Sequence, residues 1–328
     1  MSHLWRFAMT LTLATAVLSP AAAQDYPTRA VKIIVPFGAG GPADIYARFI
    51  GQHLQESLKQ TFVIENRPGA GSVIGTGEVA KSAPDGYTLL MMSNTHTTNE
   101  TLRPNKPFQL MRDFVAVAPV NYSDLLMVVH PSVPAKDLKE FLAYLKDNST
   151  KLSYGHAGVG SISYVSGTLF NSQFGLKPGL VAYRGTAPAL TDLVGGQIDY
   201  MVDQSLNVIP QIKGNTIKAY AVAAPERLAS LPDVPTTKEA GVDFIFSAWN
   251  ALVGPKGLPK DVVAKLSVAL NKALDDPGVV QRYAELGSTA PQGADRGPAG
   301  LQKLVESEMA RITPVLKEAL ADAAKTAK

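Results

Sequence analysis

The sequence predicts an α/β protein with two domains, each built on a mixed sheet flanked by helices. Short β-branched runs alternate with stretches of helical periodicity, which is typical of sheets covered by helices. Glycine-rich turns follow several of these runs, at the points where strands would end. The chain of 328 residues is also long enough for two domains of ordinary size.

A glycine-rich loop joins the first strand to the first helix. Residues 31–35 form a β-branched run, and Gly38, Gly40 and Gly41 then free the backbone. Pro42 suits the first turn of a helix, where its missing N–H is not needed. Because backbone N–H groups at a helix N-terminus bind anions, we expect this loop to hold a carboxylate.

The first domain continues the same alternation. Strands are expected at 61–65 and 87–92, with a helix between them that ends near residue 81. The polar run 93–99 is expected to follow the third strand as a loop. Such strand–helix–strand units form a parallel sheet, so their loops should gather at one edge.

Two apolar runs, 114–120 and 125–129, are expected to carry the chain into a second domain, and 225–235 to bring it back. The second domain has expected strands at 152–155, 180–183, 198–202 and 217–223 and helices at 135–147, 161–174 and 186–194. A strand at 244–254 and helices at 259–274, 277–286 and 298–321 should complete the first domain. This assigns 24–124 and 227–328 to domain 1 and 125–226 to domain 2.

The first 23 residues are typical of an export signal. Arg6 provides a positive start, 7–18 are mostly apolar, and the small residues 21–23 predict cleavage before Gln24. A membrane anchor is the alternative, but it needs about 20 apolar residues. We therefore expect a protein of the periplasm.

Composition excludes several functional classes. The chain has no cysteine, so it has neither disulfides nor a thiol nucleophile. A net charge of +3 without a basic cluster argues against nucleic acid as a partner. No two histidines have zinc-ligand spacing, and no Gly-x-Ser-x-Gly motif occurs. We expect no metal, no cofactor and no catalytic residue.

Neutral polar residues beside the glycine turns are candidate ligand donors, because they suit a carboxylate without requiring a counter-charge. These candidates are Ser72, Asn94, Thr95, Ser161, Ser163 and Thr186. Arg184 could either bind a carboxylate through two N–H groups of its guanidinium or form an ion pair at the surface. Other candidates are His96 and His156 in cleft loops, Asp203 as a loop-orienting acid or a plain cap, and Phe37, Tyr164 and Trp249 as pocket walls or core.

A dinucleotide site is a competing interpretation of the first loop. Gly38-x-Gly40-x-x-Ala43 fits the loose fingerprint, and Glu65 ends the next strand at about the expected distance. Export argues against a nicotinamide enzyme. Pro42 also removes an N–H where a pyrophosphate would need a donor.

Several motifs resemble the substrate-binding proteins of tripartite tricarboxylate transporters, the Bug-type periplasmic solute-binding proteins. They are Val31-Lys-Ile-Ile-Val-Pro-Phe with Gly40-Gly41 and Asp44-x-x-x-Arg48, Glu65-Asn-Arg-Pro-Gly-Ala-Gly-Ser72, Pro84-Asp-Gly-Tyr-Thr-Leu-Leu90, Tyr183-Arg-Gly-x-Ala-Pro-Ala-Leu-Thr-Asp-Leu-Val-Gly-Gly-Gln197, Leu231-Pro-Asp-Val-Pro-Thr236 and Trp249. They occur in the family's order and span nearly the whole chain after residue 23.

The resemblance implies a type II periplasmic binding protein, a Venus flytrap that closes on a small organic acid and is not an enzyme. Its partners would be two integral membrane transporter subunits, and we expect a monomer. The residues implied at the ligand, partly through water, are Phe37, Gly40, Gly41, Asn94, Thr95, Ser161, Tyr183 and Asp203, to which we add Ser72 and Tyr164. An exported sensor that signals to a membrane kinase is the alternative, and a dinucleotide oxidoreductase comes third.

The chain also departs from the family pattern at three positions. Ala43 stands where a hydroxyl residue is usual, Tyr164 where a histidine is usual, and Asn250 where a glycine is usual. A roomier and more aromatic pocket would follow from the first two. We therefore hypothesise an aromatic or bulky carboxylate as the ligand.

Overall fold

The computed structural model describes residues 26–326, so the predicted export signal lies outside the described residues. No helix among residues 26–326 combines the length and apolar character needed to cross a membrane. The strands are β1 (Val31–Val35), β2 (Phe62–Asn66), β3 (Thr88–Ser93), β4 (Phe114–Val129), β5 (Ser153–His156), β6 (Gly179–Ala182), β7 (Tyr200–Gln204), β8 (Lys218–Val222), β9 (Ser247–Pro255) and β10 (Ser288–Thr289). The helices are α1 (Pro42–Leu58), α2 (Val73–Ala80), α3 (Asn94–Leu102), α4 (Leu110–Asp113), α5 (Leu138–Asn148), α6 (Ile162–Gln173), α7 (Thr186–Val194), α8 (Ser205–Lys213), α9 (Lys260–Leu274), α10 (Pro277–Glu285) and α11 (Gly297–Thr326).

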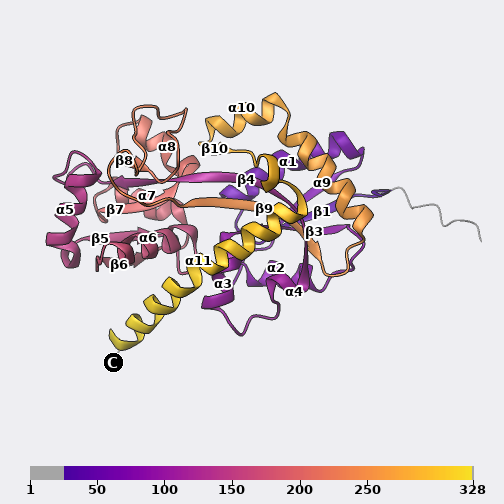
Figure 1. Ribbon diagram of the computed structural model, residues 1–328, viewed down its shortest axis with the longest axis horizontal. Coiled ribbons are helices and arrows are strands. Elements are labelled where there is room, and N and C mark those ends of the chain that lie inside the picture. Colours follow the sequence, from indigo (N-terminus) through magenta and orange to yellow (C-terminus); the bar gives the residue numbers. More distant parts are fainter. Residues whose placement is uncertain (1–25, 327–328) are drawn as a thin grey trace, which may run out of the picture.

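The strands form two mixed halves that meet at β4, in the order β2-β1-β3-β9-β4-β7-β5-β6. In the first half β1, β2 and β3 are parallel, as predicted, and β9 runs antiparallel to β3. In the second half β5 is parallel to β6 and β7, while β4 is antiparallel to β7 and β8. Helices cover both halves (Figure 1). The predicted α/β class with mixed sheets is confirmed.

Strand β4 belongs to both halves. Its first part pairs with β9 as far as Asp124 opposite Ser247, and from Leu125 onward it pairs with β7 and β8. The two apolar runs, 114–120 and 125–129, are therefore parts of one long strand. The polar residues between those runs continue the strand because the chain changes partner there without leaving the sheet.

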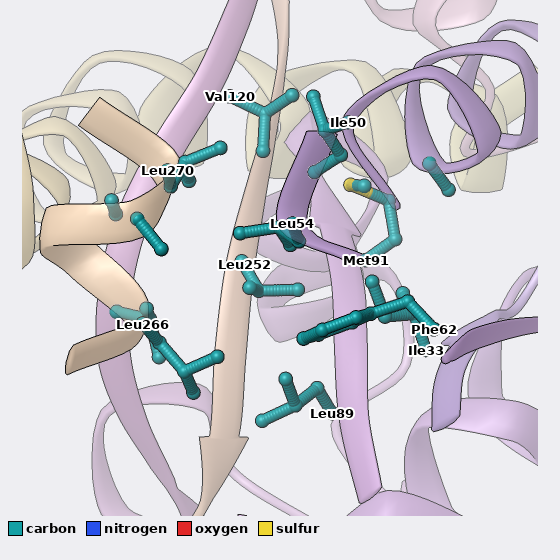
Figure 2. Packing of buried hydrophobic residues seen from close by; sticks show 14 of the residues in the cluster. Ile33, Ile50, Leu54, Phe62, Leu89, Met91, Val120, Leu252, Leu266 and Leu270 are labelled. Atoms are coloured by element: carbon teal, nitrogen blue, oxygen red, sulfur yellow. The ribbon is translucent and has the colours of Figure 1, made fainter. Parts of the chain in front are cut away.

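Separate apolar clusters stabilise the two halves. In the first half, α1 and α9 pack on β1, β3 and β9, as Figure 2 shows with Ile50, Leu54, Leu266 and Leu252. In the second half, one cluster joins β4, α5, α6 and β7. Val242, Phe244 and Phe246, which precede β9, belong to this second-half cluster.

Helix α11 packs against both halves. Leu301 and Val305 belong to a cluster of the first half, whereas Ile312 and Leu316 belong to the large cluster of the second half. Figure 1 shows the helix running diagonally across the region where β4 and β9 pass between the halves. The chain end therefore does not pack with the first half alone.

Three helices were not predicted, namely α3, α8 and the four-residue α4. The polar run 93–99 is mostly helix α3, and α8 contains Pro210. In α3 a capping box replaces the missing apolar pattern: the Ser93 side chain accepts from the third helical N–H, and His96 Nδ1 accepts from Ser93 N at 3.1 Å. His96 is fully buried, and its Nε2 lies 2.9 Å from Thr76 Oγ1. The prediction that His96 lies in a cleft loop was therefore wrong.

His96 should make stability depend on pH. Burial lowers its pKa from 6.5 to about 4. The unfolded chain therefore binds more protons between these values, and the stability present above pH 6.5 is lost as the pH falls towards 4. We expect a loss of about 3 kcal/mol across this window. Chemical denaturation from pH 7.5 to 4 should show a flatter profile for His96→Gln than for the wild-type protein; parallel profiles would contradict the expectation.

Candidate functional site

A cavity of about 800 Å³ lies between the two halves, at the carboxyl ends of parallel strands from each. The residues preceding helices α1, α3, α6, α7 and α8 all line it, namely Gly41, Ser93, Ser161, Gly185 and Gln204. Each helix N-terminus carries about half a positive charge, and its first N–H groups have no partner within the helix itself. Five of them directed at one cavity favour an anionic ligand.

A polar network fixes the loop between β1 and α1. Asp44 accepts from Gly40 N at 2.9 Å and from Asn66 Nδ2 at 3.0 Å, and Arg48 Nη2 lies 3.0 Å from Asp44 Oδ1. Burial acts to raise the pKa of Asp44, but these hydrogen bonds and the Arg48 charge outweigh it and hold the pKa below its usual value. Asn66 Nδ2 also donates to Phe37 O at 3.2 Å. Gly40 N is thus committed to the loop's own structure.

A serine pair shapes the opposite wall. Ser161 caps α6, and its Oγ accepts from Tyr164 N at 3.2 Å. Ser163 Oγ lies 3.2 Å from Ser161 Oγ and accepts from Ala157 N at 3.0 Å. Four glycine and serine residues of this turn (Gly158, Gly160, Ser161 and Ser163) line the cavity.

Asn94 connects the cavity to β9 and α11. Its Oδ1 accepts from Trp249 N at 2.7 Å, and its Nδ2 donates to Glu308 Oε1 at 2.7 Å. Arg311 also binds Glu308, at 2.8 Å. Asn94 lines the cavity as predicted, but its side chain serves to hold Trp249 and α11 in place.

The cavity wall is electropositive. Arg103 and Arg184 are its charged residues, and no aspartate or glutamate occurs among the lining residues that the structure describes. Among the side chains of residues 26–321, neither arginine has an ion-pair or hydrogen-bond partner. The surface ion pair considered for Arg184 is thus absent from the described part of the chain.

Six of the ten predicted ligand contacts line the cavity: Phe37, Gly40, Gly41, Asn94, Thr95 and Ser161. The other four lie outside the lining. Ser72 is buried beside Asn99, and Tyr183 donates its hydroxyl to Asp192 at 2.7 Å. Asp203 is fully buried and accepts from Thr186 and Asn207, so it orients two residues that do line the cavity.

Tyr164 is the fourth predicted ligand contact that lies outside the cavity lining. Its ring packs edge-on against His156, with centroids 5.0 Å apart, rather than on the cavity wall. The predicted preference for an aromatic acid therefore has no support from Tyr164. His156 itself is buried at the end of β5 and accepts from Gly158 N at 3.2 Å, so it braces the turn instead of lying in a cleft loop.

Glu65 was the acid on which the dinucleotide interpretation depended. It lies 3.0 Å from Lys32 and 2.8 Å from Arg67. These ion pairs hold its pKa below the usual value, with the hydrogen bond from Lys32 as the largest cause. The Glu65 carboxylate thus forms ion pairs with two cations at the end of β2, instead of being free to bind a ribose hydroxyl.

Several residues that line the cavity were not predicted from the sequence. Arg103 stands in a short connection without periodicity, and Gly71 reaches the cavity although its neighbour Ser72 does not. Gln204, Asn207 and Gln211 line it because α8, which was not predicted, begins at its edge. Phe37 and Trp249, proposed as walls, do line it. Across the described side chains, residues 26–321, no three His, Asp or Glu residues are grouped so as to hold a metal ion.

The architecture is similar to that of known proteins. MatC from Rhodopseudomonas palustris with bound malate matches with a TM-score of 0.80 at 40% identity, over 88% of this chain and 99% of MatC. The periplasmic binding protein BugD matches with a TM-score of 0.80 at 36% identity, over 90% of this chain and 98% of BugD. A UPF0065 protein of the TAR-I ttuE-ttuC' intergenic region of Agrobacterium vitis is 41% identical over 317 residues, which are 96% of this chain and 91% of that protein.

The two-domain α/β fold and the cavity between its halves define a solute-binding receptor. The family described as "Tripartite tricarboxylate transporter family receptor" matches residues 46–320. The chain belongs to this family, whose Bug-type members are periplasmic solute receptors and not enzymes.

Proposed function

We propose that this protein is a periplasmic receptor that binds a small organic carboxylate between its two halves, closes around it and delivers it to the two membrane subunits of a tripartite transporter. The observation that carries the proposal is the convergence of five helix N-termini on a cavity with two arginines and no acid in its described lining. Malate bound in MatC, 40% identical to this chain, supports the ligand class.

One further donor supports carboxylate binding. Trp249 lines the cavity, and its Nε1–H is buried without a hydrogen-bond partner among the residues described. A buried donor without a partner is unfavourable by about 1–3 kcal/mol. A ligand oxygen or a ligand-bound water would remove that penalty.

The proposed export and domain division complete this function. Cleavage before Gln24 would release the mature receptor into the periplasm. The first crossing between domains is proposed between Asp124 and Leu125, where β4 changes partner. The chain is proposed to return to the first domain at the start of β9 rather than at residue 227, because Val242, Phe244 and Phe246 pack with the second half. Closure would then bend β4 and β9.

A thermal-shift experiment on protein purified from the periplasm tests the proposal. The protein is first unfolded in guanidinium and refolded, which removes any ligand that co-purifies. A carboxylate at 100 times its Kd stabilises the native state by about 2.7 kcal/mol, so we expect the Tm to rise by about 5 °C. The probes are L-malate, succinate, citrate and benzoate, with sodium chloride of equal ionic strength as the control.

NAD is the opposing probe. A shift with NAD and with none of the acids would overturn the receptor proposal and favour the dinucleotide interpretation of the first loop. A shift with malate or succinate alone would support the proposal and define the ligand class.

A further inference from the structure

Arg103 is a charged residue of the cavity wall that was not among the predicted site residues. It follows the last turn of α3, with φ −135° and ψ 65°. Its position is shaped by Gly71, which has a φ of +62°: a Cβ at Gly71 would lie 3.1 Å from Arg103 Nη2 and 3.2 Å from Nε. The absence of a side chain at Gly71 thus leaves space for the guanidinium beside the cavity.

The charge of Arg103 is not neutralised by the described part of the protein. The nearest acid in sequence, Glu100, lies 3.0 Å from the buried Lys106 and accepts from Leu110 N at 3.0 Å. None of the ion pairs or side-chain hydrogen bonds among residues 26–321, whose side chains the structure describes, includes the Arg103 guanidinium. A half-buried guanidinium without a partner favours a planar oxyanion, which it binds through two N–H groups.

Arg103 and Arg184 come from different halves of the protein. Arg103 follows a helix of the first half, whereas Arg184 follows β6 in the second half. Together they give the described lining two formal positive charges and no negative charge. An acid with a single carboxylate, held at the helix N-termini, would leave at least one of these charges unpaired.

We infer that Arg103 is a specificity-determining residue that binds the second carboxylate of the ligand and thereby selects doubly charged acids over singly charged ones. This inference rests on the proposed function. It adds a prediction that the receptor proposal does not make, because a carboxylate receptor can equally well bind monoanions.

Arg103→Gln tests the inference by calorimetry with matched pairs of probes. Succinate is compared with succinamate, and adipate with its monoamide, so that each pair differs in one carboxylate at nearly constant size. The wild-type protein should prefer the diacid of at least one pair by 10-fold or more. Arg103→Gln should weaken diacid binding by about 10- to 100-fold and change monoamide binding by less than 3-fold.

Two further variants serve as controls. Arg103→Lys keeps the charge but loses the planar fork, so it should bind the diacid with intermediate affinity. Arg282→Gln removes an exposed arginine that pairs with Glu285 on α10, away from the cavity lining, and should leave both affinities unchanged. Thermal unfolding of Arg103→Gln would verify that the fold is retained.

The outcomes separate the inference from the proposed function. Equal losses for diacid and monoamide would assign Arg103 a structural role and overturn the inference. Unchanged diacid binding in Arg103→Gln, or a wild-type protein without preference for the diacids, would overturn it while leaving the receptor proposal intact. A wild-type protein that binds no acid of any kind would overturn both.

Discussion

Ser161→Asp should abolish carboxylate binding while leaving the fold intact. Aspartate is as good an N-cap as serine, so it can accept from Tyr164 N in the same way and keep the start of α6. It also introduces a negative charge into a lining that has none among the described residues. Repulsion between charges about 4–5 Å apart near a protein surface amounts to about 3–4 kcal/mol, so the Kd should rise on the order of 100-fold or more.

Ser161→Asn is the matched control for this substitution. Asparagine has nearly the same size and caps helices equally well, but it is neutral. We expect it to retain the affinity for the acid within about 10-fold. Calorimetry with L-malate measures binding, and thermal unfolding measures the fold; wild-type affinity in Ser161→Asp would show that the anion site lies elsewhere.

The second large effect is expected at Glu308. Its carboxylate is 5% exposed and accepts from Asn94 Nδ2, which in turn positions Trp249. Glu308→Ala leaves the buried Asn94 amide without its acceptor and removes a fixed contact between α11 and α3. We expect the protein to lose about 3 kcal/mol of stability, or about 6 °C in Tm, and to bind its acid about 10-fold more weakly.

Glu308→Gln distinguishes this hydrogen bond from the ion pair with Arg311. The glutamine oxygen can still accept from Asn94, and only the charge pair is lost. Because the Arg311 side chain is 45% exposed, that pair contributes less than about 1 kcal/mol. Similar thermal unfolding of the alanine and glutamine variants would contradict a structural role for the Asn94 contact.

The parts of the fold that were predictable are those where local chemistry and tertiary packing agree. The strand at Val31–Val35 and the helix starting at Pro42 follow from a β-branched run, a glycine loop and a helix-initiating proline, and both lie where predicted. Helix α7 also has the predicted bounds, Thr186–Val194. In these segments the structure that the local sequence favours is also the one that packs in the folded protein.

The missed elements depend on contacts between distant residues. Helix α3 has no apolar stripe and is held by the His96 cap, by Thr76 and by Glu308, whose positions relative to α3 depend on the tertiary fold. Helix α8 contains a proline, which ordinarily argues against a helix interior. Strand β4 continues through polar residues because β9 and then β7 pair with it.

The same distinction applies to the site. Phe37, Thr95 and Ser161 line the cavity and could be predicted to lie near one another, because the loops that follow parallel strands gather at one edge of a sheet. Arg103 was not predicted, since it lies beyond the end of a helix and reaches the cavity beside Gly71, 32 residues earlier in the chain. Tyr183 was placed at the correct strand end, but its hydroxyl turns to Asp192.

Helix α11, which packs on both halves, would also restrict the proposed closure. Two adjacent strands, such as β4 and β9, form a flexible ribbon that can both bend and twist. A rigid rod that lies across this ribbon and contacts both halves, as α11 does through Leu301 and Ile312, would resist twisting more than bending. In the proposed closure, the motion left to the halves would be close to rotation about a single axis, so the carboxyl ends of the strands on either side would meet in the same register each time.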